Sequence, residues 1–210
     1  MIDLFLKIGS SVCHQLGERS LHLGEYVLPV CARCTGIYIS FFISFIYLIF
    51  TKGYRGNKPF KIRETLFMVI CLLLLMVDGV GSYIGFWQSN NLLRIITGSL
   101  AGFVVLPFMV LIYNFSPQYK NDKYIFKKSF HIYLIGFIAV SLGALLYLGV
   151  FDSLYYIISI VISLGIVIYY SSIFCVIIKL LFSKLSDKYI ILISIIFAIT
   201  IIMVVSYIIR

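Results

Sequence analysis

The sequence predicts an all-α, polytopic bundle of about six transmembrane helices, preceded by a short N-terminal segment that contains cysteine and histidine. Of its 210 residues, 62% are hydrophobic and only 12% are charged, whereas soluble domains have about 45–50% apolar and about 25% charged residues. Apolar runs long enough to cross a bilayer, about 20 residues each, recur along the chain. Its 5 cysteines are too sparse for a secreted disulfide scaffold, and polar sequence is too scarce for a disordered protein.

Residues 1–31 precede the first apolar run and form the predicted N-terminal segment. Met1–Ile8 are apolar but short, with an acid and a base among them, so we expect an interfacial helix rather than a cleavable signal peptide. Pro29 is well suited to the first turn of a helix, which places Cys31 and Cys34 near the N-terminus of the first span.

Residues 32–210 form the predicted transmembrane domain. Its six expected spans are Ala32–Phe50, Thr65–Phe86, Leu92–Phe115, Phe130–Val150, Leu154–Phe182 and Tyr189–Ile209. The last three spans carry little besides Ile, Leu, Val, Tyr and scattered Ser, while the unusual polar residues all fall earlier. We therefore expect a functional half at residues 32–115 and a scaffold half at residues 130–209.

Basic residues predict how the chain is oriented in the membrane. Lys and Arg number 17 against 8 Asp and Glu, a net charge of +9. In a soluble protein this surplus would suggest a nucleic-acid partner, but here 12 of the 17 flank the first, third and fifth connections between spans. They are Lys52, Arg55, Lys58, Lys61, Arg63, Lys120, Lys123, Lys127, Lys128, Lys179, Lys184 and Lys188. The bias predicts a multi-pass cell-membrane protein with both termini extracytoplasmic and no nucleic-acid partner.

A group of cysteines and histidines at the start of the chain predicts a metal site. Cys31 and Cys34 are spaced C-x-x-C, which can place two thiolates on one ion. Cys13, with either His14 or His22, supplies the remaining ligands of a Cys3His set. We expect a tetrahedral zinc site, structural or with an open position.

Two other interpretations of the same cysteines stay open. The predicted orientation puts the thiols on the oxidising side of the membrane, which favours a disulfide or a redox-active dithiol. Alternatively, the cysteines are free thiols that only pack against neighbouring side chains. A helix N-terminus lowers a thiol pKa and so favours the thiolate that both metal binding and disulfide exchange require.

A second polar group surrounds Asp78, the only acid within a predicted span. An acid in hydrocarbon is costly and normally marks a function or an ion pair. Arg94, at the mouth of the next span, is its expected partner, and the pair would fix a helical hairpin. We expect Asn91 to be the N-cap of that span.

The polar residues around Asp78 predict a ligand pocket on the same outer side as the cysteines. The candidate substrate-binding residues are Asp78, Ser89, Asn90, Asn91, Arg94 and Thr97, of which Asp78 and Arg94 are also catalytic candidates. Such a group suits binding and proton transfer alike. Two Gly-x-x-x-Gly pairs, Gly81 with Gly85 and Gly98 with Gly102, predict close helix packing beside it.

Several of these motifs resemble those of a family of predicted polytopic membrane proteins of unknown function in bacteria and archaea. The matching stretches are Cys13-His14-Gln15 with Glu18-Arg19-Ser20, then Pro29–Gly36, Asp78-Gly79, and Ser89–Arg94 with Thr97-Gly98. The resemblance covers roughly Cys13 to Gly102, and it departs from the family pattern at Gly17 and Ser82. It implies a membrane protein with a site in its first half, but it implies no activity.

Our leading hypothesis is a membrane protein that binds a metal ion, zinc, beside a pocket that binds substrate or transfers protons. The second hypothesis is a thiol–disulfide oxidoreductase in which Cys31 and Cys34 exchange with Cys13 and a quinone. The third is a carrier of lipid phosphates or small ions, with Arg94 holding the anion. The expected partners are the lipid bilayer and an unidentified small ligand, and the residues are compatible with an enzyme or a transporter.

Overall fold

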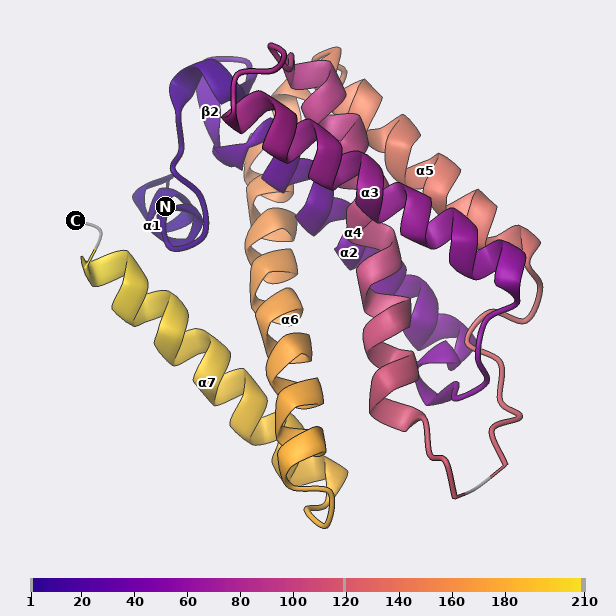
Figure 1. The fold of residues 1–210 in the computed structure, drawn as a ribbon. Helices are drawn as coiled ribbons and strands as arrows, with labels where there is room; N and C mark the ends of the chain where they lie inside the picture. Colours follow the sequence, from indigo (N-terminus) through magenta and orange to yellow (C-terminus); the bar gives the residue numbers. More distant parts are fainter. Residues whose placement is uncertain (1, 119, 209–210) are drawn as a thin grey trace.

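The computed structural model describes residues 2–118 and 120–208, and within them six helices are long and apolar enough to cross a membrane (Figure 1). They are α2 (Ala32–Thr51), α3 (Ile62–Tyr83), α4 (Asn91–Asn114), α5 (Phe130–Tyr147), α6 (Tyr155–Leu181) and α7 (Asp187–Ile208). Each of the six predicted spans is confirmed to within three residues at either end, except that Ile209 lies outside the described residues.

Helices α2 and α4 form the centre of the bundle. Helix α2 contacts α4, α5 and α6, while α4 also contacts α3. Glycine makes the α2–α4 contact possible: a Cβ on Gly98 would lie 2.2 Å from the carbonyl oxygen of Arg33, and one on Gly36 would lie 2.5 Å from that of Ile95. A Cβ on Gly102 would likewise lie 2.2 Å from the carbonyl oxygen of Ile37. The predicted packing role of Gly98 and Gly102 is confirmed.

The same prediction is wrong for Gly81 and Gly85. Gly85 lies beyond the end of α3 with a φ of +75°, and a Cβ there would meet nothing within 4 Å. The Phe86 N–H donates to the carbonyl of Gly81 at 2.9 Å, so Gly85 ends the helix in a Schellman turn. A Cβ on Gly81 would meet the ring of Trp87 rather than another helix.

The N-terminal segment is more ordered than the sequence indicated. It consists of the short helix α1 (Ile2–Ser10), the 3-10 turn η1 (Gly17–Arg19), and an antiparallel hairpin of β1 (Ser20–Leu23) and β2 (Tyr26–Cys31). Leu23 pairs with Tyr26 across a two-residue turn, in which Gly24 has a φ of +59°. Apolar side chains of both strands are buried against α2, α4 and α6: Leu21, Leu23, Leu28 and Val30. The hairpin is therefore anchored in the core and not free above it.

The bundle has two chemically different ends. The cysteine end, at the top of Figure 1, carries the hairpin, the α3–α4 connection, and the α5–α6 connection with η3 (Asp152–Leu154). The basic end, at the bottom, carries the α2–α3 connection with η2 (Gly53–Arg55), and the α4–α5 and α6–α7 connections. The 12 basic residues counted from the sequence all lie in or beside these last three connections.

Candidate functional site

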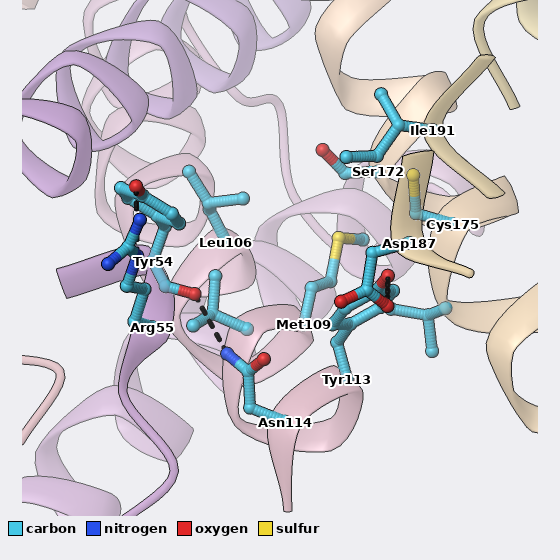
Figure 2. A pocket seen from close by; sticks show the side chains of 12 residues that line it. Tyr54, Arg55, Leu106, Met109, Tyr113, Asn114, Ser172, Cys175, Asp187 and Ile191 are labelled. Carbon is cyan, nitrogen blue, oxygen red and sulfur yellow. Dashed lines mark hydrogen bonds between the residues drawn. The ribbon is translucent and has the colours of Figure 1, made fainter. Parts of the chain in front are cut away.

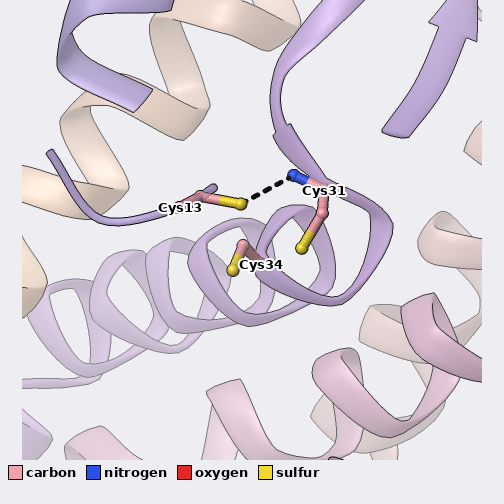
Figure 3. A group of neighbouring side chains, drawn as sticks. All are labelled: Cys13, Cys31 and Cys34. Carbon is pink, nitrogen blue, oxygen red and sulfur yellow. Dashed lines mark hydrogen bonds between the residues drawn. The ribbon is translucent and has the colours of Figure 1, made fainter. Parts of the chain in front are cut away.

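Three cysteine thiols meet at the cysteine end (Figure 3). Cys31 is the last residue of β2 and the N-cap of α2, Cys34 lies in the first turn of α2, and Cys13 follows α1. Their sulfur atoms all lie within 4.8 Å of one another, and none of the three is in a disulfide. The Cys31 backbone N–H donates to the Cys13 Sγ at 3.3 Å. Each side chain is partly exposed, so the cluster is open to a small ligand.

Gln15, two residues after Cys13, joins α1 to β2. Its side-chain amide donates to the carbonyl oxygens of Leu6, at 2.6 Å, and Pro29, at 2.8 Å. Its own φ is +49°, a left-handed conformation that is costly for a residue with a Cβ. A Cβ on Gly9 would lie 1.8 Å from the Pro29 carbonyl oxygen, so α1 packs directly on β2. The role of Gln15 was not predicted, although Gln15 belongs to the Cys-His-Gln motif.

Hydrogen bonds among the three thiols shift their pKa values in opposite directions. Hydrogen bonding from the side chain of Cys31, and then from that of Cys34, lowers the pKa of the Cys13 thiol far below its ordinary range. The same bond to Cys13 raises the pKa of Cys31. Cys13 is therefore the first of these thiols to ionise, and its thiolate is the form that binds metals and attacks disulfides.

Neither predicted histidine joins the cysteines. His14 is exposed beside Cys13, and His22 is exposed on β1. Within residues 2–118 and 120–208, the ligand group contains the three sulfur atoms and no histidine or carboxylate. The expected Cys3His set is thus wrong in its fourth member. Three sulfur donors remain, which would leave the fourth position of a tetrahedral ion to water or another ligand.

Asp78 is buried in α3, with 2% of its surface exposed, and its partner is Arg33 rather than Arg94. Arg33 donates to Asp78 Oδ2 from Nε at 2.9 Å and from Nη2 at 2.5 Å. The predicted Asp78–Arg94 pair is wrong because the α2–α4 crossing decides the geometry. The Arg33 backbone lies against Gly98 of α4, and from there its side chain reaches α3.

Thr97 completes the surroundings of Asp78 from α4. Its hydroxyl lies 3.2 Å from Asp78 Oδ2 and 2.9 Å from the Leu93 carbonyl oxygen. The buried Ser89 hydroxyl also interacts with this carboxylate, while Oδ1 accepts no well-formed hydrogen bond from the described residues. Residues from α2, α3 and α4 therefore meet at one buried acid.

The N-cap of α4 is Asn90 rather than the predicted Asn91. The Asn90 side chain accepts from the Leu93 N–H at 2.7 Å, so Asn90 is the N-cap and Asn91 the first helical residue. Asn91 instead donates to the Glu18 carbonyl oxygen at 3.2 Å and accepts from Arg94 Nη1 at 3.0 Å. It ties the N-terminal segment to α4.

Arg94 connects the two polar groups electrostatically. The positive charges of Arg19 and Arg33 act on its guanidinium, as do the negative charges of Asp78 and of Cys31 when ionised. Since Arg33 already pairs with Asp78, Arg94 has no carboxylate partner of its own in the described part of the chain. Arg94 therefore lies within electrostatic range of both the thiol cluster and the Asp78 group.

The part of the chain that contains these polar residues is similar to known proteins. Residues 13–108 match the family described as "Predicted membrane protein (DUF2085)". An uncharacterized protein of Methanocaldococcus jannaschii is 38% identical over 114 residues, 54% of this chain and 70% of that protein. An uncharacterized protein of Methanothermobacter thermautotrophicus is 34% identical over 93 residues, 43% of this chain and 78% of that protein. No solved structure matches the chain.

Proposed function

Because the chain belongs to this family of predicted membrane proteins, and the matched residues include the whole polar site, we propose that its function depends on that site. The proposed function is the binding of one divalent metal ion, zinc, by the thiolates of Cys13, Cys31 and Cys34. The fourth position of the ion would hold a small ligand. The observation that carries this proposal is the convergence of three unpaired thiols from two separate segments.

The spacing of the sulfur atoms suits a tetrahedral ion. Zinc–sulfur bonds of about 2.3 Å place the sulfurs of a tetrahedral site roughly 3.8 Å apart, and the three sulfurs are already within 4.8 Å of one another. The backbone N–H of Cys31 bonded to Cys13 Sγ supports the same interpretation, because hydrogen bonds around a metal ligand orient it and tune its basicity.

The charges around the cluster also support the proposal. Three thiolates and one Zn²⁺ carry a net charge of −1, and Arg94 acts electrostatically on Cys31. With Arg33 neutralised by Asp78, Arg94 is a cation without a carboxylate partner among the described residues and is available to an anionic or polar ligand. We propose that Asn90, Asn91, Arg94 and the Asp78 group bind this ligand beside the metal.

Thiol–disulfide exchange is a second candidate function that the same geometry favours. Oxidation of Cys31 and Cys34 to a disulfide releases two protons and two electrons, which a quinone or an external disulfide would accept. Cys13 lies close enough to attack that bond, since all three sulfurs are mutually near.

We propose further that the cysteine end faces away from the cytoplasm. The 12 basic residues at the opposite end support this orientation. A cysteine introduced at exposed Gln88, in the α3–α4 connection, should react with a membrane-impermeant maleimide in intact cells above the background of the unmodified chain. One introduced at exposed Lys184 should react only after lysis; the reverse pattern would overturn the orientation.

Metal analysis of the purified protein tests the proposed function. We expect about one zinc per chain in the unmodified protein and in Cys71→Ala, which removes a thiol outside the cluster. Zinc should be lost from Cys13→Ala, Cys31→Ala and Cys34→Ala. A count of free thiols before and after reduction distinguishes zinc binding from thiol–disulfide exchange. A metal-free protein whose cluster thiols appear only after reduction would overturn zinc binding and support exchange.

A further inference from the structure

A cavity lies at the basic end, far along the helices from the cysteines. It has a volume of about 410 Å³ and lies between η2, α4, α6 and α7 (Figure 2). Its volume is within the range of pockets that hold small ligands, about 300–1,000 Å³. None of the residues of the thiol cluster or the Asp78 group lines it.

The cavity is apolar along its depth. Leu106, Met109 and Val110 of α4 form one wall, and Cys175 and Ile191 of α6 and α7 form the facing wall. Leu106 lies eight residues before Asn114, the last residue of α4, which at 1.5 Å per residue corresponds to about 12 Å of depth. An occupant would therefore have an apolar portion that enters the hydrocarbon region.

The mouth of the cavity is polar. Asp187 at the start of α7 accepts hydrogen bonds from Tyr113, at 2.8 Å, and from Lys179, at 2.9 Å. Asn114 donates to the carbonyl oxygens of Tyr54 and Gly56. These groups lie where α2, α4, α6 and α7 begin or end, which is the level of the membrane interface.

The charge at the mouth favours an anion. Arg55 lines the cavity and bonds to the Tyr54 hydroxyl at 3.1 Å, and among the described residues it has no carboxylate partner. Lys179 is neutralised by Asp187, so Arg55 provides the uncompensated charge. Basic residues at this level attract anionic lipid headgroups.

We propose that this cavity is a binding site for an anionic phospholipid, whose phosphate lies at Arg55 and one of whose two acyl chains lies along α4 between Leu106 and Tyr113. The site does not depend on metal binding at the cysteine end.

Native mass spectrometry of the detergent-purified protein, titrated with phosphatidylglycerol or phosphatidylcholine, tests this proposal. We expect the protein to bind one molecule of phosphatidylglycerol. Its affinity for this lipid should be higher than its affinity for phosphatidylcholine. Arg55→Gln should weaken phosphatidylglycerol binding about five-fold, the effect of one basic residue near an anionic headgroup. Arg63→Gln is the matched control, because exposed Arg63 lies at the same end but outside the cavity.

A second variant tests the apolar portion. Met109→Trp should fill the cavity and abolish binding of both lipids. If this variant does not fold, Arg55→Gln, which changes an exposed side chain, still decides the question. Equal affinity for the two lipids, or equal loss in Arg55→Gln and Arg63→Gln, would overturn the proposal.

Discussion

Buried polar residues of the two transmembrane halves form different kinds of contact. In residues 32–115, polar side chains join different helices: Arg33 of α2 bonds Asp78 of α3, and Thr97 of α4 bonds the same carboxylate. In residues 130–208, two of the buried serines bond their own helices instead. Ser163 and Ser194 each donate to the carbonyl four residues earlier, at 2.8 and 2.7 Å.

This difference indicates where the constraints on the sequence are strongest. A polar bond between helices fixes their relative position and leaves a buried charge if one partner is lost, whereas a serine bonded to its own helix can be replaced with little consequence. The family match, residues 13–108, coincides with the half in which polar groups join helices. The following predictions test the contrast in order of expected effect.

The largest effect is expected for Arg33→Gln. It leaves the Asp78 carboxylate buried without its cation, which costs about 3–5 kcal/mol of unfolding free energy. Arg94→Gln, which removes a hydrogen bond to Asn91 but no ion pair, should cost about 1 kcal/mol or less. Reversible unfolding in mixed detergent micelles measures both. Equal losses would contradict the assignment of Arg33 as the partner of Asp78.

A smaller effect is expected for Gly98→Ala at the α2–α4 contact. The added Cβ would lie 2.2 Å from the Arg33 carbonyl oxygen, and overpacking of this kind costs about 1–3 kcal/mol. Gly79→Ala in α3 is the control, because a Cβ there meets nothing within 4 Å. The midpoint temperature of thermal unfolding should be well below that of Gly79→Ala for Gly98→Ala. Equal midpoints for the two variants would contradict a tight contact at Gly98.

Gln15→Ala should destabilise the N-terminal segment by about 1–2 kcal/mol. It removes two hydrogen bonds, to Leu6 and Pro29, each worth about 1 kcal/mol. We also expect weaker zinc retention against a chelator, because Cys13 loses the turn that holds it. Gln88→Ala, at an exposed position in the α3–α4 connection, should change neither property. Unaltered zinc retention in Gln15→Ala would show that Gln15 does not position Cys13.

The smallest effect is expected in the second half. Ser163→Ala and Ser194→Ala remove hydroxyls that donate to carbonyls of their own helices, so each should change the unfolding free energy by less than about 1 kcal/mol. Neither should alter the zinc content. A loss comparable with that of Arg33→Gln would mean that these buried serines stabilise the fold as much as the ion pair between helices does.

The sequence predicts the spans well because an apolar run of about 20 residues has few other folded forms. It does not predict the hairpin, because strands of four and six residues carry little pattern. It misassigns the partner of Asp78, since the choice between Arg33 and Arg94 depends on how closely Gly98 lets α2 approach α4. It includes His14 as a ligand because of its proximity in sequence, but adjacent side chains of a non-helical segment need not face the same way.

X-ray absorption spectroscopy at the zinc edge of the purified, zinc-containing protein is the most direct test of the metal site. Three thiolate ligands predict three sulfur scatterers at about 2.3 Å and one nitrogen or oxygen scatterer at about 2.0–2.2 Å. The sulfur count should fall in Cys34→Ala and stay at three in Cys71→Ala and His14→Ala. A spectrum without sulfur scatterers, or one that changes in His14→Ala but not in Cys34→Ala, would contradict a metal centre built from Cys13, Cys31 and Cys34.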